Sequence, residues 1–196
     1  MTMPGGGTWS LAPGQITDDS ELAMCQLRGL VAGNGKFDAF QIARYYGYWI
    51  YTGPFDCGRT TAQGLGPLAK CRDNPDPQVS YKAAAKGYAA TSLSNGSLMR
   101  ATPLAVWSQH LNLTELQQAV TGDVRFMHSL PAMTNIVTAY CIVVGTLIRN
   151  AGEDNRATLA LEAVEEYASR REVDTCVAQW ITVAKNIAEL MTSEDR

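Results

Sequence analysis

The sequence has little charge and no excess of basic residues. Only 18 % of its 196 residues are charged, and 16 basic against 19 acidic side chains give a formal net charge of −3. Disordered chains are richer in charge and poorer in apolar residues than this one, of which 46 % is apolar. A protein that binds nucleic acid through a basic surface is also excluded, so no nucleic-acid partner is expected.

Several familiar motifs are missing. The five cysteines form no C-x-x-C pair, which excludes a zinc ribbon or a thioredoxin-type site (Cys25, Cys57, Cys71, Cys141 and Cys176). There is no G-x-S-x-G elbow and no Walker sequence. The first residues lack the basic and apolar regions of a signal peptide. We therefore expect reduced thiols and a cytoplasmic location.

No apolar run is long enough to predict a membrane span. The longest, residues 132–148, is interrupted by polar side chains at Thr134, Asn135, Thr138 and Tyr140. A membrane-spanning helix needs about 20 mainly apolar residues. This segment is predicted to be a buried helix, and no membrane partner is expected.

Alternating Val, Ile and Thr runs are also absent, which argues against strands. Helical spacing and turn residues instead predict one all-α domain over residues 1–196, a compact multi-helix bundle. Helices are expected near residues 19–32, 37–51, 60–70, 81–91, 98–111, 132–150, 155–170 and 173–191. Thr114 and Gln117 are expected to form a capping box for a further helix between the fifth and sixth of these.

Hard oxygen ligands stand at the start of the first predicted helix. Thr17, Asp18, Asp19 and Ser20 offer two carboxylates and two hydroxyls, the groups that Mg²⁺ and Mn²⁺ prefer. The alternative is ordinary capping, in which these side chains accept hydrogen bonds from the first N–H groups of the helix.

Three other segments could carry chemistry. Asp56, in a Gly- and Pro-containing loop, could contact a sugar hydroxyl or act as a base; the alternative is a turn aspartate. Residues 94–100, Ser-Asn-Gly-Ser-Leu-Met-Arg, could bind a phosphate through backbone N–H groups, or could merely open a helix. His128 could contact a substrate or move a proton; the alternative is a structural histidine.

Taken together and in this order, these segments resemble the ADP-ribosylglycohydrolases. Residues 13–24, Pro-Gly-Gln-Ile-Thr-Asp-Asp-Ser-Glu-Leu-Ala-Met, are similar to the first metal motif of that family. The match leans towards the dinitrogenase reductase-activating glycohydrolase branch, whose substrate loop resembles Phe55-Asp56-Cys57-Gly58. Residues 94–100 are similar to the Asn-Gly-x-x-Met-Arg segment of the family, and Met127-His128-Ser129 stands where the family has a Thr-His or Ser-His pair.

The resemblance implies a fold, a reaction and a set of site residues. The family is an all-α bundle with a dinuclear Mg²⁺ or Mn²⁺ site that removes ADP-ribose from modified side chains or cleaves related small substrates. Carried over by position, the metal ligands are Thr17, Asp18 and Asp19, and the catalytic residues are Asp18, Asp19 and Asp56. The implied substrate-binding residues are Asp56, Gly58, Asn95, Gly96, Ser97, Met99 and His128. The branch favours arginine-linked ADP-ribose.

Two parts of the family pattern are not found. No Gly-Asp-Ala-x-Gly segment precedes residue 13, and no Asp-x-Asp lies between His128 and Arg196. We therefore expect a chain shortened at both ends that lacks half of the metal ligands, with self-association or a partner chain completing the fold. A non-catalytic ADP-ribose-binding or structural relative stays open as the alternative. An unrelated helical scaffold also stays open if Asp18 and Asp19 are mere caps.

Overall fold

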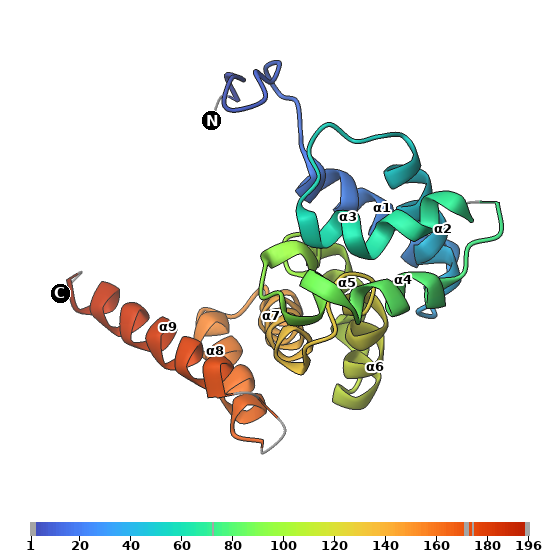
Figure 1. The fold of residues 1–196 in the computed structure, drawn as a ribbon. Helices are drawn as coiled ribbons and strands as arrows, with labels where there is room; N and C mark the ends of the chain where they lie inside the picture. Colours follow the sequence, from blue (N-terminus) through green and yellow to red (C-terminus); the bar gives the residue numbers. More distant parts are fainter. Residues whose placement is uncertain (1–2, 72, 171–172, 174, 195–196) are drawn as a thin grey trace.

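Apolar side chains at helical spacing produce an all-α protein. The computed structural model describes residues 3–71, 73–170, 173 and 175–194, and within these ranges it contains helices and no strand. Figure 1 shows their arrangement. The α-helices are α1 (Asp18–Ala32), α2 (Ala39–Tyr51), α3 (Arg59–Leu65), α4 (Pro77–Ala84), α5 (Thr102–Trp107), α6 (Leu113–Val124), α7 (Pro131–Arg149), α8 (Arg156–Ala168) and α9 (Thr175–Glu194). The 3₁₀ helices are η1 (Gly66–Lys70), η2 (Gly87–Thr91), η3 (Asn95–Ser97) and η4 (Ser108–His110).

The first two helices form an antiparallel hairpin. At one end Gly29 lets the helices approach closely, because a Cβ there would lie 2.9 Å from the Cα of Ile42. At the other end the indole Nε1 of Trp49 donates a hydrogen bond to Glu21, at 2.7 Å. This geometry brings the start of α1 beside the loop that follows α2.

The α7 helix is the apolar segment that the sequence predicts to be buried. By length and composition alone it is the one described helix that could cross a membrane. It packs against α5, α6 and α8, and it buries Met133, Val137 and Cys141 in the main core. A smaller core of Ala139, Val164, Tyr167 and Val177 attaches α8 and α9 to its other side, where Figure 1 shows these two helices. The expected core helix is confirmed.

Two local predictions were wrong. The capping box of α6 joins Asn112 and Glu115, two residues before the predicted pair: Asn112 Oδ1 accepts from Glu115 N at 3.0 Å, and Glu115 Oε2 accepts from Asn112 N at 3.1 Å. The Ala-rich stretch 81–91 is not one helix. The Gln63 side chain donates to the backbone oxygens of Ala83 and Lys86, which ends α4 early and separates it from η2.

The fifth predicted helix was also misplaced. The structure begins α5 at Thr102 rather than near Leu98, and residues 95–97 form the short helix η3 instead. Pro103 lies in the first turn of α5, as its missing N–H requires. The later start leaves residues 94–101 as a connecting segment, and this segment holds part of the candidate site.

Candidate functional site

The carboxylates at the start of α1 are only partly used for capping. Asp18 is buried, and its Oδ1 accepts a hydrogen bond from the backbone N–H of Asp19 at 3.2 Å. Thr17 is the N-cap residue, yet its side chain makes no capping hydrogen bond and instead donates weakly to Asp19 Oδ2 at 3.5 Å. The Thr17 hydroxyl and the exposed Asp19 carboxylate therefore remain available to a ligand.

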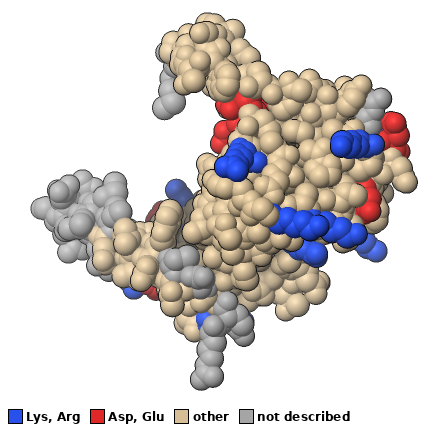
Figure 2. Space-filling model, in the orientation of Figure 1, with Lys and Arg blue, Asp and Glu red and all other residues tan. Residues whose placement is uncertain are grey.

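The hairpin brings Asp56 to the same place. Burial is the main reason why the pKa of Asp18 is raised, and repulsion from the charges of Asp56 and then Asp19 raises it further. The neighbouring Cys57 thiol has its pKa raised to about 11 by burial, with a further contribution from Asp18 and Asp56. Figure 2 shows acidic side chains gathered where the N-terminal segment joins the body of the molecule.

The donor chemistry of this group suits a hard divalent cation, although the number of donors is small. Thr17, Asp18 and Asp19 offer hydroxyl and carboxylate oxygens, and a cation would relieve the repulsion between the carboxylates. Within the part of the chain that the structure describes, no three His, Cys, Asp or Glu side chains are placed to hold a metal ion together. These residues can therefore supply only part of a metal coordination shell.

A second group of predicted residues surrounds His128. This imidazole is fully buried, with Nδ1 at 2.7 Å from Ser97 Oγ and Nε2 at 3.2 Å from Ser94 Oγ. Ser94 also donates to Thr60 Oγ1 at 3.1 Å, at the start of α3. The hydrogen bonds connect residues that are far apart in the sequence, and they fix the course of the segment 94–97.

Gly96 lies against the same ring. A Cβ at this position would lie 3.3 Å from Thr61 Oγ1 and 3.6 Å from His128 Cε1, so a side chain here would press on both. Of the other predicted residues in this segment, Asn95 is exposed and Met99 packs against the main core. The structure thus brings Gly96, Ser97 and His128 together and leaves Asn95 at the surface.

The start of α3 connects the two groups. Gly58 is the N-cap residue of α3, so Asp56 comes just before this helix and Thr60 stands in its first turn. On the other side of α3, a Cβ at Gly64 would lie only 2.2 Å from the backbone oxygen of Phe126. This close approach holds α3 against the segment that carries His128. The loop of Asp56 therefore leads directly into the helix whose Thr60 is hydrogen-bonded to Ser94 in the His128 network.

A buried ion pair lies directly beneath this site. Arg100 Nη1 is 2.7 Å from Asp123 Oδ2, and both side chains are fully buried. The Tyr46 hydroxyl donates to Asp123 at 3.0 Å and accepts from Arg100. Burial alone would lower the pKa of the Arg100 guanidinium, but the Asp123 carboxylate outweighs it and raises that pKa. Since Arg100 Nε donates to the Gly96 oxygen at 3.2 Å, the ion pair supports the segment at His128.

Sequence reasoning assigned no role to Thr60, Thr61 or Asp123, and for Tyr46 it predicted only an aromatic residue of the core or of a groove wall. For the two threonines, the sequence predicted only that one of them begins a helix. Tyr46 and Asp123 carry no local signal, because nothing in their neighbouring residues indicates that they face a buried arginine. The Asn-Gly-x-x-Met-Arg resemblance was the one available signal, since it ends at Arg100.

The environment of His128 predicts that the stability of the fold depends on pH. Burial, and then the charge of Arg100, lowers the pKa of His128 to about 4. In the unfolded chain His128 binds a proton near pH 6.5, whereas in the folded protein it binds one only near pH 4. Acidification between these two values therefore destabilises the fold. Between pH 7 and pH 5 we expect a loss of about 2 kcal/mol, measured by urea unfolding, that His128→Gln removes. His110→Gln, at the exposed histidine, should keep the wild-type loss; an unchanged profile for His128→Gln would contradict the prediction.

The N-terminal segment reaches the loop of Asp56. The rings of Trp9 and Phe55 meet edge to face with their centroids 6.2 Å apart. Both rings are about half exposed. Because Phe55 directly precedes Asp56, this aromatic pair lies beside the loop that carries that carboxylate. The fluorescence of Trp9 can therefore report on changes at Asp56.

Comparison with known proteins identifies the family. The family model described as ADP-ribosylglycohydrolase matches residues 1–196. The chain belongs to the ADP-ribosylglycohydrolase family. The all-α fold and the resemblance noted from the sequence are thereby confirmed.

Three relatives are similar to this ADP-ribosylglycohydrolase chain. A protein of Acanthamoeba polyphaga mimivirus whose name assigns it as an ADP-ribosyl glycohydrolase is 30 % identical over 170 residues, which are 84 % of this chain and 49 % of that protein. The ADP-ribosyl-[dinitrogen reductase] glycohydrolase of Rhodospirillum rubrum is 28 % identical over 148 residues, 76 % of this chain and 45 % of its own. The ADP-ribosylarginine hydrolase of Pseudomonas putida is 30 % identical over 126 residues, 61 % of this chain and 31 % of its own. The chain spans about half the length of the first two relatives.

Proposed function

We propose that this chain removes ADP-ribose from modified protein side chains. The observation that carries the proposal is that the charges of Asp56 and Asp19 converge on the buried Asp18 carboxyl at the start of α1. Two of the relatives are named for activity on ADP-ribosylated arginine or on dinitrogen reductase, which supports a modified protein as the substrate and an arginine linkage in particular.

Each part of the site has a proposed role. Thr17, Asp18 and Asp19 would hold Mg²⁺ or Mn²⁺, with water and substrate oxygens completing the roughly six oxygens that such an ion prefers. When bound, the ion supplies Lewis-acid polarisation of the ribose hydroxyls and an activated water. Asp56 lies beside Asp18, where its carboxylate can stabilise the positive charge that develops on the ribose as the glycosidic bond breaks.

The segment that contains residues 94–97 would form the wall against which ADP-ribose lies. Gly96 brings its backbone close to Thr61 and His128, and Asn95 presents an exposed amide at the edge of that wall. Both nitrogens of His128 already bind serines, so this histidine holds the wall in place and is not the general base. Gly58 and Met99 fix the loop and the segment at their ends.

The test is release of free ADP-ribose from an ADP-ribosylarginine protein, followed by chromatography with Mg²⁺, with Mn²⁺ and with a chelator. We expect release that depends on the metal and stops with the chelator, because the ion would supply both polarisation and activated water. Calorimetric binding of ADP-ribose without any release would instead favour the non-catalytic alternative. Folded protein that neither releases nor binds ADP-ribose would contradict the proposal.

A further inference from the structure

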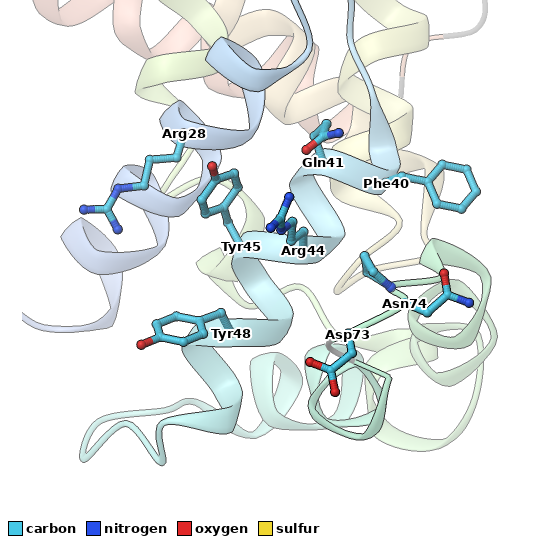
Figure 3. A pocket seen from close by; sticks show the side chains of 9 residues that line it. Arg28, Phe40, Gln41, Arg44, Tyr45, Tyr48, Asp73 and Asn74 are labelled. Atoms are coloured by element: carbon cyan, nitrogen blue, oxygen red, sulfur yellow. The ribbon is translucent and has the colours of Figure 1, made fainter.

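A polar hollow lies against the α1–α2 hairpin, and none of Asp18, Asp19 and Asp56 lines it. It has a volume of about 770 Å³, and Figure 3 shows the side chains that line it. Arg28 projects from α1 and Arg44 from α2, with Tyr45 between them in this view. Tyr48 follows along α2, and residues 73–75 complete the other side.

The carboxylate of Asp73 also lines the hollow, but the two arginines leave it with a net positive charge. Both are exposed, and among the described residues neither has a carboxylate within 4.0 Å or a hydrogen-bond partner. Guanidinium groups bind carboxylates through two parallel hydrogen bonds, which gives geometric specificity as well as attraction. Their position on either side of an aromatic ring suits an extended ligand that carries more than one negative charge.

The aromatic residues indicate that this ligand is a protein. Phe40 is 59 % exposed and Tyr48 is 63 % exposed, although both stand on a helix whose other face is fully buried. Protein interfaces are enriched in Tyr, Phe and Arg, and the residues that dominate their binding energy are enriched in Tyr and Arg. A hollow lined by two arginines and three aromatic side chains has this composition.

The position of the hollow connects it to the active site. Arg28 lies about 15 Å along α1 from Asp18, at a rise of about 1.5 Å per residue. Tyr48 lies near the end of α2 that leads to the loop of Asp56. A modified protein whose ADP-ribose occupied the carboxylate site could therefore reach the hollow with a segment of only about five extended residues.

We infer that this hollow, defined by Arg28, Arg44, Tyr45 and Tyr48, docks an acidic segment of the ADP-ribosylated substrate protein. This inference rests on the proposed function, and it adds a determinant of protein selectivity outside the catalytic carboxylates. The inference predicts that docking in the hollow affects the cleavage of protein substrates and leaves the cleavage of a small ADP-ribosyl compound unchanged.

The direct test is fluorescence anisotropy of a fluorescein-labelled octaglutamate peptide titrated with the full chain at low ionic strength. We expect saturable binding that becomes about tenfold weaker in the double variant Arg28→Gln/Arg44→Gln, which loses two charge-assisted contacts. The matched control is Lys82→Gln/Arg156→Gln, which removes the same charge from exposed positions on α4 and α8. Equal weakening in both double variants, or no binding by the wild type, would overturn the inference.

Turnover distinguishes failure of the docking surface from failure of the proposed function. The Arg28→Gln/Arg44→Gln variant should raise KM for an acidic modified protein about tenfold, leave kcat unchanged, and cleave ADP-ribosylarginine as the wild type does. Peptide binding lost in that variant, with no turnover by any form of the chain, would contradict the proposed function and leave the surface standing. Turnover of the modified protein that is unaffected by the variant would overturn the surface alone.

Discussion

Asp18→Asn is expected to reduce metal-dependent release of ADP-ribose by at least about 1,000-fold, a size typical of removing a group that activates the reacting water. Asn keeps the Oδ1 that accepts the Asp19 N–H, so the start of α1 should persist. What the variant loses is the negative charge at the point where Asp18, Asp19 and Asp56 converge. The measurement is initial rate of release with saturating Mn²⁺.

The same variant should be more stable than the wild type at neutral pH without metal. Burial and the neighbouring carboxylates raise the pKa of Asp18 in the folded protein, so keeping this carboxyl ionised costs folding free energy above its ordinary pKa. Asn removes that cost, and we expect Tm at pH 7 to rise by a few degrees. The gain should vanish below about pH 3.8, where Asp18 is protonated in both the folded and the unfolded state.

A matched control is Asp38→Asn, which makes the same change at the start of α2. Asp38 is an ordinary cap whose carboxylate accepts from the N–H groups of Phe40 and Gln41 at 2.8 and 3.4 Å, and Asn caps a helix about as well. This variant should keep wild-type activity. If Asp18→Asn also kept it, Asp18 would be an ordinary cap and the proposed metal site would be wrong.

Much of the fold could be predicted from local sequence. Apolar spacing and turn residues such as Gly33 and Gly152 placed the ends of α1 and α7 within one or two residues of their observed bounds. One error occurred where a distant side chain decided the outcome, whereas the capping box of α6 and the start of α5 were misplaced within their own local sequence. The α4 helix ends where the Gln63 side chain donates hydrogen bonds to the backbone oxygens of Ala83 and Lys86. No pattern within residues 81–91 contains that information.

The candidate site was also predictable only in part from the sequence. Asp18, Asp19 and Asp56 were recognisable because they stand, in order, in segments that resemble the motifs of the family; on spacing alone, ordinary capping and a turn aspartate stayed open. Their convergence depends on the α1–α2 hairpin, which spacing alone does not specify. The arginine hollow was missed entirely, since Arg28 and Arg44 look like ordinary solvent-exposed positions on two separate helices.

The buried Arg100–Asp123 pair should matter most for stability. Arg100→Met would leave the Asp123 carboxylate fully buried without its cation, with only the Tyr46 hydroxyl as a side-chain partner. Breaking one side of such a pair typically costs about 3–5 kcal/mol, because the desolvated charge stays behind. We expect that loss in the free energy of urea unfolding at pH 7. The exposed pair Arg170–Glu166, at 3.6 Å, gives the matched comparison, and Arg170→Met should cost less than about 1 kcal/mol.

The double variant Arg100→Met/Asp123→Leu separates stability from function. Replacing both charges with apolar side chains removes the unpaired carboxylate, and most of the lost stability should return. The hydrogen bond from Arg100 Nε to the Gly96 oxygen does not return, so the segment beside Ser97 and His128 loses its support. A stable protein with weaker binding of ADP-ribose would show that the ion pair positions this segment. Affinity for ADP-ribose that recovered together with stability would contradict that role and make the pair a purely structural element of the core.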